Sequence, residues 1–365
     1  MADSRVFLLS CPVQHYAWGK LGFSSEVAQL LANSDPMMVQ IQEDKPYAEM
    51  WMGTHPRGDA VIPDTDISEK TLGKWIANNL PCLGNSVKKT YGNLPFLFKV
   101  LSVNTALSIQ AHPNKELAAK LHAQAPEHYP DNNHKPEMAI ALTPFQALCG
   151  FRPVQEIVDF LQKVPELRLL IGSKAAEELE QSVGQDLQTI SSALRVCFTK
   201  MMKSEKEDFE EQLHILVKRI SQEDCVECMA CSDNTVRAGL TPKFIDVTTL
   251  CDMLNYTPAP SSSKLFPPVA DEVDPYVFIY NPPVPEFAVL QIKVPSTTRF
   301  YTVTNIESAS ILLVVKGKAK GNPAVSKSEL SLQRGTVVFI AANEFLSLEL
   351  SPEEDLLMFR ACCLL

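Results

Sequence analysis

The 365-residue sequence predicts a mainly β protein with a helical insertion and a C-terminal jelly-roll-like β domain. Three observations predict this class. Short apolar runs broken by proline and turn residues fill roughly the first 150 residues, as in short strands. Apolar residues then recur with a period of 3.6 from Arg152 to Gln222, which indicates helices. From about residue 275 to the end, apolar strands with turn glycines return, as in a jelly roll.

The composition bounds the kind of protein. Hydrophobic residues make up 45% of the chain and charged residues 21%, as in a soluble globular protein, and the length predicts two or three domains. The net charge of -10 disfavours nucleic acid or a membrane surface as the main partner, although a local cluster of Lys and Arg can still bind a small anion. No run is long enough to span a membrane and no signal peptide is evident, so the ten cysteines are expected to be reduced thiols in the cytosol.

A strand followed by a helix is predicted around Leu107 to Glu116. Side chains alternate along a strand, so Ser108, Gln110 and His112 share one face. Pro113 ends the strand, and the next residue, an asparagine, is placed to cap the following helix. An imidazole and an amide oxygen therefore lie together at the end of a strand.

A second polar group opens the predicted strand that ends at Leu142. Glu137 is its first residue, preceded by His134 and Lys135. Imidazole, amide and carboxylate ligands of this kind suit zinc, provided that a fourth ligand or water completes the shell. The alternative is a polar strand face on which His and Gln are simply hydrogen-bonded, and the pattern leaves both interpretations open.

Three further features complete the first part of the chain. Ser25 to Leu31 is a helix candidate, and Leu94 to Leu101 is typical of a buried strand. Lys99 interrupts that strand, so it either extends to solvent or faces a polar cavity that holds a counter-charge. Aromatic and polar residues around Trp18 and over 46–56 are, taken singly, more typical of packing and turns.

The helical segment carries two apolar stripes and, before the second, a capping-box spacing. The first stripe consists of Val154, Ile157, Val158 and Leu161. The capping-box spacing runs from Ser204 to Glu207. The second stripe consists of Phe209, Leu213, Leu216, Val217 and Ile220. His214, beside the second stripe, is expected on the helix surface. The helix then runs without Gly or Pro into a predicted strand that begins near Cys225, an unusually abrupt join.

That strand holds a spacing of cysteines, Cys225, Cys228 and Cys231, which admits a metal cluster or small buried thiols. An iron–sulfur run would need another Cys where Thr235 stands, and no fourth zinc ligand is near. The pattern allows two interpretations of Glu227 and Arg237: they are a solvated pair of surface charges, or they are residues of a site.

Near the end, a short helix is expected over Val247 to Leu254 and a linker over Thr257 to Ser263. Strands follow at Ser310 to Gly317 and at Leu332 to Ile340. This last region has no histidine, so we expect a sheet sandwich without a metal.

Several long motifs run along the chain: Tyr16–Gly19, Pro46–Pro56, Leu97–Leu101, Gln110–Pro113, His134–Met138 and Ser232–Gly239. Together they resemble the type I phosphomannose isomerases, that is, the mannose-6-phosphate isomerase family of animals and fungi. The resemblance implies a cupin-type β-barrel catalytic domain over 1–151, resumed in shortened form over 223–263, a helical domain over 152–222 and a C-terminal β domain over 264–365. It also implies an enzyme with one zinc per chain that interconverts mannose 6-phosphate and fructose 6-phosphate through a cis-enediol and supplies GDP-mannose synthesis. We expect a cytoplasmic monomer that acts on a small sugar phosphate and binds neither nucleic acid nor membrane.

The resemblance carries roles to particular residues. Gln110, His112 and Glu137 resemble zinc ligands of the family, and Arg237 resembles its catalytic arginine. Two further side chains, Lys135 and Glu227, are candidates for the general base. The residues that resemble those around the sugar are Lys99, His134, Ser108 and Trp18.

One departure from the family is expected to matter. In the family, further helix and barrel strands follow the helical domain and carry a Pro-His pair, whose histidine is the fourth zinc ligand. Here Gln222 runs directly into Glu223, as though this block had been skipped. The alternatives are therefore an active isomerase, an inactive variant that still binds sugar phosphate or a partner, and a metal-free cupin-like binding protein unrelated to isomerases.

Overall fold

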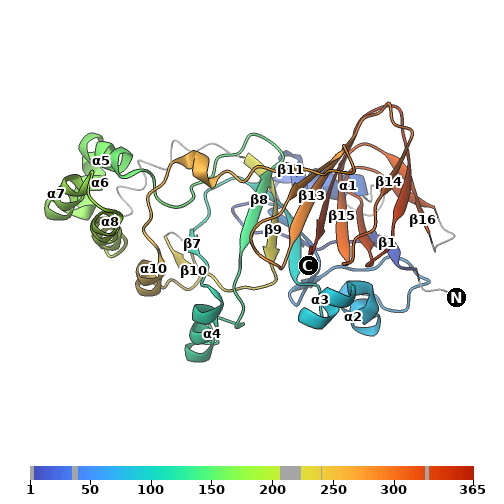
Figure 1. Ribbon diagram of the computed structural model, residues 1–365, viewed down its shortest axis with the longest axis horizontal. Helices are drawn as coiled ribbons and strands as arrows, with labels where there is room; N and C mark the ends of the chain where they lie inside the picture. Colours follow the sequence, from blue (N-terminus) through green and yellow to red (C-terminus); the bar gives the residue numbers. More distant parts are fainter. Residues whose placement is uncertain (1–3, 35–39, 206–222, 240, 325–328) are drawn as a thin grey trace.

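A computed structural model describes residues 4–34, 40–205, 223–239, 241–324 and 329–365. Its β part is a stack of three sheets, and a group of helices forms the opposite end of the molecule (Figure 1). The mainly β architecture with a helical insertion and a C-terminal β domain is thus confirmed, in agreement with the cupin-type description.

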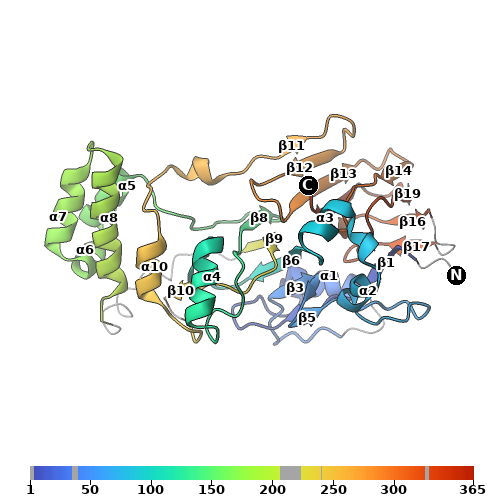
Figure 2. The ribbon, with the colours of Figure 1, turned by 60° about the horizontal axis from the view of Figure 1, so that its bottom comes forward.

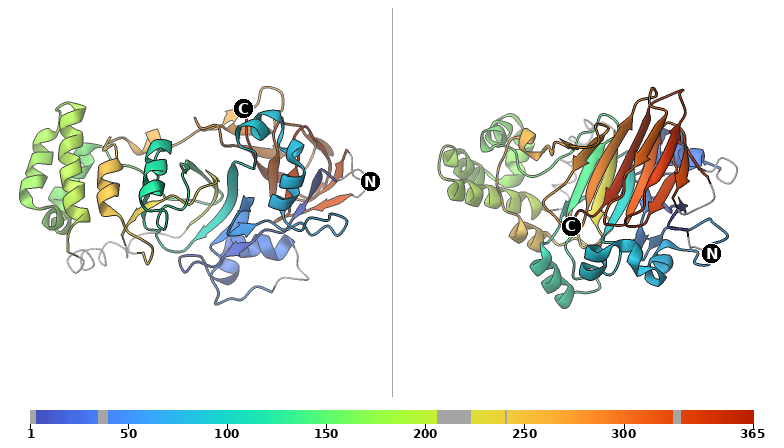
Figure 3. Two further views of the ribbon diagram at one scale, coloured as in Figure 1. Left: turned by 90° about the horizontal axis from the view of Figure 1, so that it is seen from below. Right: turned by 45° about the vertical axis from the view of Figure 1, so that its right-hand side comes forward.

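The middle layer is a seven-stranded sheet in the order β1-β18-β15-β20-β13-β12-β11. Its strands are β1 (Val6–Leu9), β11 (Val269–Ala270), β12 (Val277–Tyr280), β13 (Ala288–Val294), β15 (Ser310–Lys316), β18 (Val337–Ile340) and β20 (Leu356–Cys362). The right-hand view of Figure 3 looks onto these strands. The first strand of the chain therefore pairs with β18, more than 300 residues later in the sequence.

The second layer is a five-stranded sheet in the order β2-β3-β6-β9-β8. It consists of β2 (Val13–Gln14), β3 (Glu49–Met52), β6 (Phe96–Val103), β8 (Glu137–Ala141) and β9 (Glu223–Ala230). Phe96 and Phe98 of β6 pack in one core with Phe339 and Phe359 of the seven-stranded sheet. The predicted buried strand at Leu94 to Leu101 is confirmed by β6.

The third layer covers the other face of the seven-stranded sheet. It contains β14 (Phe300–Val303), β16 (Ala319–Pro323), β17 (Leu330–Leu332) and β19 (Leu346–Leu350). Leu312 of β15 packs toward this layer, whereas its neighbour Leu313 packs toward the five-stranded sheet. A strand covered on both faces needs apolar residues at every position, which explains the continuous apolar run at Ser310 to Lys316.

The helices lie at the margins of these sheets and in a separate group. They are α1 (Glu26–Ser34), α2 (Leu72–Asn78), α3 (Asn85–Thr90), α4 (Lys115–Gln124), α5 (Val154–Lys163), α6 (Pro165–Ile171), α7 (Ser173–Ser182), α8 (Leu187–Met202) and α10 (Val247–Met253), with 3-10 turns η1 (Gly22–Ser24), η2 (Leu80–Leu83) and η3 (Ser261–Lys264). Val158 and Leu161 of the first predicted stripe are buried in a core formed by α5 to α8, to which Tyr256 adds its ring. The second stripe, the capping box and His214 lie outside the described residues.

One short sheet and two helices connect the helical group to the β layers. In that sheet, β7 (Ile109–Ala111) pairs with β10 (Val236–Ala238). A second short sheet, β4 (Thr54–His55) with β5 (Gly58–Asp59), lies against β3 and α2. Figure 2 shows α4 and α10 beside β10, between the helical group and the sheets. Leu121 of α4 and Leu250 of α10 pack there against Val236 and Ala238 of β10.

Local expectations are largely confirmed, with two corrections. The strand expected over Ser108 to His112 is shorter, because only Ile109–Ala111 pair with another strand. The stretch expected as a linker over 257–263 overlaps η3, and its Ala259 amide donates to the carbonyl of Phe151, so it has local structure and a backbone contact. No helix in the described ranges is both long and apolar enough to cross a membrane.

Candidate active site

The predicted ligands lie in β7, just after it, and at the start of β8. Gln110 lies in β7 directly opposite Arg237 of β10, so the two share one face of this small sheet. His112 follows β7, and Glu137 is the first residue of β8. Nε2 of His112 lies 3.1 Å from Oε2 of Glu137, so these two side chains from different segments are in contact.

The contacts of His112 define its protonation. Nδ1 lies 2.8 Å from the carbonyl oxygen of Asn234, which can only accept, so Nδ1 carries a proton. A neutral imidazole would then turn the lone pair of Nε2 toward an oxygen of Glu137, and two acceptors repel. The pair therefore needs a shared cation, either a proton on Nε2 or a metal ion. A histidine that donates Nδ1–H to a backbone carbonyl and faces a carboxylate has the usual surroundings of a metal ligand.

Lys135 holds the other oxygen of Glu137. Its Nζ lies 2.9 Å from Oε1, and its side chain is only 11% exposed. Burial by itself would raise the pKa of Glu137, but the hydrogen bond with His112 and the charge of Lys135 hold that pKa well below its usual range. Glu137 is thus an anion with both oxygens engaged by positive or polarisable groups.

The donor set fits a metal only in part. Over the described part of the chain, no three or more His, Cys, Asp and Glu side chains are grouped to hold one ion. His112 and Glu137 supply two donors, and the exposed amide of Gln110 is a third of another type. Of the other described histidines, His134 is bound to Glu286, His55 to Asp233 and His122 to a backbone carbonyl, so none of these three stands at the pair.

Asn234 contacts His112 of the His112–Glu137 pair and was not predicted as a site residue. It is fully buried, and its Nδ2 donates to the carbonyl oxygens of Asp131, at 2.7 Å, and Asn133, at 2.8 Å. Its own carbonyl oxygen accepts from His112. One residue therefore joins the loop that leads to Glu137 with the histidine. The sequence could not predict this role, because an asparagine in a polar motif does not show which backbone groups it will contact.

Of the two alternatives for Lys99, the structure shows the second: the lysine is buried and has a counter-charge. Its Nζ lies 3.3 Å from Oε2 of Glu49 and 5.2 Å from the centre of the Trp51 ring. Trp51 also donates its indole N–H to the same carboxylate. The backbone of Glu227 in β9 lies opposite Lys99, which places these two predicted residues side by side in the sheet. Glu49 is a neighbour that sequence reasoning missed, since its carboxylate looks like any other within its motif.

A second group of charges surrounds Asp233. Arg57 and Nε2 of His55, the latter 3.4 Å away, both contact its carboxylate. Burial opposes ionisation there, but the hydrogen bond with His55 and the charges of His55 and Arg57 lower the pKa of Asp233 to about 2. Nearby, burial lowers the pKa of the Arg237 guanidinium, and the charge of Arg57 lowers it further while Asp233 opposes that change. These cations form a local positive region in an acidic protein.

The aromatic edge of this region comes from the first motif. Trp18 stacks on Tyr16 with ring centres 5.7 Å apart. Nζ of Lys243 lies 5.3 Å from the centre of the Tyr16 ring. Burial and the nearby charge of Arg237 lower the pKa of Lys243. Lys243 was not predicted as a site residue, because it follows a proline in a segment that resembles an ordinary loop.

The remaining predicted residues have other positions. Ser108 is half-buried just before β7. His134 does not join the metal pair; its Nε2 bonds Glu286 of the C-terminal region at 2.7 Å. Cys231, at the end of β9, has a thiol whose pKa burial raises to about 11, and the described cysteines are free thiols.

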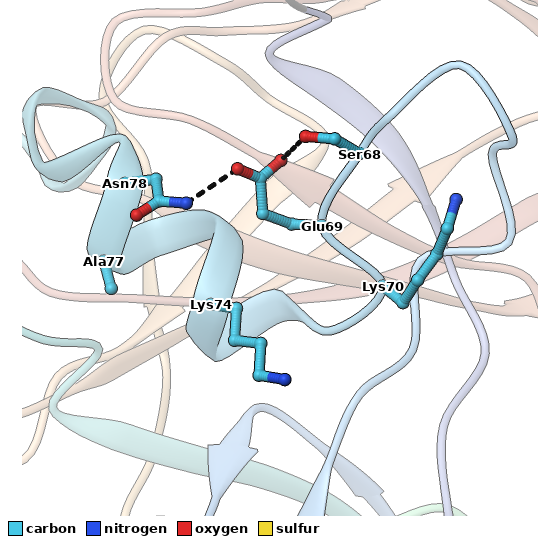
Figure 4. Close-up of a pocket in the computed structure, with 6 residues that line it drawn as sticks. All are labelled: Ser68, Glu69, Lys70, Lys74, Ala77 and Asn78. Atoms are coloured by element: carbon cyan, nitrogen blue, oxygen red, sulfur yellow. Dashed lines mark hydrogen bonds between the residues drawn. The ribbon is translucent and has the colours of Figure 1, made fainter.

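A separate pocket lies beside α2, away from these residues (Figure 4). It has a volume of about 450 Å³ and is lined by Ser68, Glu69, Lys70, Lys74, Ala77 and Asn78. Both oxygens of Glu69 are already hydrogen-bonded, to Ser68 and Asn78, and Nζ of Lys70 donates to a backbone carbonyl. None of the predicted site residues lines this pocket.

Comparisons with known proteins identify the family of the chain. Residues 6–154 match the family described as phosphomannose isomerase type I, catalytic domain; residues 170–235 match its helical insertion domain, and 278–320 its C-terminal domain. The mannose-6-phosphate isomerases of Bos taurus and Homo sapiens are 57% and 55% identical to the chain, with 100% of each chain covered. That of Aspergillus fumigatus is 35% identical and covers 97% of this chain and 96% of its own.

Solved structures agree as well. The mannose 6-phosphate isomerase of Salmonella typhimurium, bound to its substrate and to zinc, has a TM-score of 0.80 at 26% identity and covers 99% of this chain and 100% of its own. A zinc-bound mannose 6-phosphate isomerase has a TM-score of 0.79 at 25% identity, with the same coverage. The chain therefore belongs to the type I phosphomannose isomerase family.

Proposed function

We propose that this protein is an aldose–ketose isomerase that interconverts mannose 6-phosphate and fructose 6-phosphate. The observation that carries the proposal is the contact of His112 with Glu137, a pair that needs a shared cation. Lys135 contacts the same carboxylate, and the charge of Arg237 interacts with it. Relatives 55 to 57% identical over their full length bear the name of this activity. A local cluster of cations suits a phosphorylated sugar even though the whole chain is acidic.

Zinc is the metal we assign to the pair, with one ion per chain. His112 and Glu137 would hold it together with Gln110, and the proton that His112 Nδ1 donates to Asn234 leaves Nε2 free to bind a metal. When bound, zinc supplies Lewis-acid stabilisation to an oxygen that becomes negative during the reaction. Zinc in two solved relatives supports this choice.

The reaction moves one proton between two neighbouring carbons. A base takes the proton from C2 of the open-chain aldose and delivers it to C1, while a proton passes from the hydroxyl on C2 to the oxygen on C1. The intermediate is a cis-enediol. Lys135 and Glu227 are the two candidates for the base, and loss of a well-placed base should lower the rate by roughly 10² to 10⁴.

Other side chains would hold the substrate. The planar guanidinium of Arg237 suits either the enediolate oxygens or the phosphate, and it lies opposite Gln110 in the small sheet. Lys99, Ser108 and Trp18 are assigned to the sugar. His134 is also placed near it by family resemblance, although its Nε2 is committed to Glu286.

We also infer that an internal block is absent after residue 222. The alignment with the Bos taurus relative spans 424 positions, whereas this chain has 365 residues, so some positions of the relative have no counterpart here. A missing fourth ligand would weaken zinc binding and could leave a variant that binds sugar phosphate without converting it. This inactive variant is the second candidate function.

The setting that we propose is a cytosolic monomer that supplies GDP-mannose synthesis. Its partner would be the small phosphorylated sugar, with no nucleic acid and no membrane. The net charge of -10 supports the last two exclusions.

A coupled isomerase assay with metal analysis of the 365-residue chain tests the proposal. We expect turnover of mannose 6-phosphate with about one zinc per chain, and loss of both in His112→Ala and Glu137→Ala. His122→Ala is the matched control, because its Nδ1 also bonds a backbone carbonyl, at 2.7 Å, but it lies on α4 outside the site. Unchanged zinc and turnover in both site variants would refute the assignment. Binding of fructose 6-phosphate in a calorimeter without turnover would establish the second candidate.

A further inference from the structure

A buried carboxylate from the C-terminal region reaches the segments that carry the metal pair. Glu286 precedes β13, and only 1% of its surface is exposed. Its Oε1 accepts from Nε2 of His134 at 2.7 Å and contacts Nζ of Lys115 at 3.1 Å. No sequence pattern assigns a role to this residue.

The two partners of Glu286 occupy matching places. Lys115 opens α4 and lies three residues after His112, whereas His134 lies three residues before Glu137. A single carboxylate oxygen therefore ties together the two stretches whose ligands meet 3.1 Å apart. Through Glu286, both stretches are joined to the C-terminal region.

The surroundings hold Glu286 in place and in its charged form. The next residue, Phe287, is buried in the core between the two large sheets. The carbonyl of Pro285 accepts from the thiol of Cys363 at 2.9 Å. Burial would raise the pKa of Glu286, but its bonds to His134 and Lys115 lower it instead. Its second oxygen, Oε2, is buried without a hydrogen-bond partner among the described residues, so the contacts with both segments are made by Oε1 alone.

We propose that Glu286 is a positioning residue, which sets the spacing of His112 and Glu137 by clamping the segments that carry them to the seven-stranded sheet. The C-terminal β region thereby becomes part of the active site. Where the inference concerns zinc, it rests on the function proposed above. Glu286 would act on the site only by positioning these segments, since its polar contacts among the described residues are with His134 and Lys115 and not with His112 or Glu137.

The test compares three variants by two measurements. Glu286→Gln keeps the shape and removes the charge, and Lys115→Met removes one contact from a side chain that is 58% exposed, so this variant should fold. Glu344→Gln is the matched control, because Glu344 is also a carboxylate largely buried in an ion pair, with Arg5, but is remote from the site. The measurements are zinc affinity, by competition with a chromophoric chelator, and amide hydrogen exchange of the metal-free chains over 110–116 and 134–138.

We expect Glu286→Gln to weaken zinc binding roughly tenfold, as loss of an outer partner of a metal site does, and to speed exchange in both segments. Lys115→Met should change both readouts in the same direction by less, and Glu344→Gln should change neither. Exchange and zinc affinity unchanged in both Glu286→Gln and Lys115→Met would overturn the proposal. Equal changes in the control would also overturn it, because they would show a general loss of stability. If the parent chain binds no zinc, the proposed function fails, while hydrogen exchange still decides whether Glu286 clamps the two segments.

Discussion

Replacing Asn234 by aspartate tests the support of His112 with almost no change of shape. The Nδ2 group of Asn234 donates to two carbonyl oxygens, of Asp131 and Asn133, and the residue is fully buried. Asn234→Asp removes both donors and turns a carboxylate oxygen toward two acceptors. The loop that leads to Glu137 then loses its tie to the residue that orients His112.

The expected cost follows from the groups left unpaired. A buried acceptor that loses its partner costs about 1 to 3 kcal/mol. The carbonyl oxygen of Asp131 loses its donor in the variant, whereas that of Asn133 keeps the hydroxyl of Ser232 at 3.3 Å. The new carboxylate is buried without a counter-charge and faces Oδ1 of Asp131, to which Nδ2 of Asn234 donates at 3.2 Å, so repulsion between two carboxylates adds to this cost. We therefore expect Asn234→Asp to lower the free energy of unfolding by about 3 to 5 kcal/mol at neutral pH, and to weaken zinc binding roughly tenfold.

Urea unfolding followed by tryptophan fluorescence measures the first effect. The matched control is Asn33→Asp, because the Nδ2 of Asn33 also donates to a carbonyl oxygen, at 2.7 Å, but the side chain is exposed. The control should lose less than about 1 kcal/mol. Equal unfolding midpoints for Asn234→Asp and the parent would refute the reasoning that buried donors hold this loop.

Three further predictions concern other parts of the molecule. Arg237→Lys should lower kcat by roughly 10² in the isomerase assay, because an ammonium cannot replace a planar two-pronged donor; full kcat would exclude Arg237 from the reaction. Gly84→Ala should cost more than about 3 kcal/mol in urea unfolding, because Gly84 has φ +84° and a Cβ would clash with the carbonyl oxygen of Glu307. Gly92→Ala, at φ +68° with open space around it, should cost only about 1 to 2 kcal/mol. Asp233→Asn should destabilise the chain at pH 7 by about 1 to 2 kcal/mol. The bond with His55 lowers the pKa of Asp233 in the folded state to about 2, so Asp233 stabilises the fold above about pH 4, and this stabilisation disappears as the pH falls from about 4 to 2. The prediction would be contradicted if the difference in unfolding free energy between Asp233→Asn and the parent stayed the same at low pH.

Much of the local structure could be predicted from short-range patterns. Asn114 caps α4 as expected, since its side chain accepts from the amide of Leu117 at 2.9 Å. Lys99 interrupts an apolar strand and does have a buried counter-charge, because an unpaired ammonium at that depth would be too costly. The strand expected at Ser108 to His112 proved shorter, because pairing requires a partner strand, and β10 spans only three residues.

The active site could be predicted only as far as its motifs reached. Gln110, His112 and Glu137 were named from residue type and family resemblance, and their roles stay predictions. Asn234 and Glu286 were not found, because an amide or a carboxylate reveals no role until its partners are known. The same holds for Glu49, whose value to the site depends on the lysine opposite it.

By itself, the sequence determined the periods of its helices and strands, the ends of many of them, and the family, because these depend on neighbours along the chain or on long runs of identical residues. Only the tertiary structure decided that His112 meets a carbonyl 122 residues away and that His134 meets a carboxylate 152 residues away. Such contacts arise when whole sheets pack face to face, and this packing is driven by the burial of their apolar faces. The local sequence does not show which polar groups that packing will bring together.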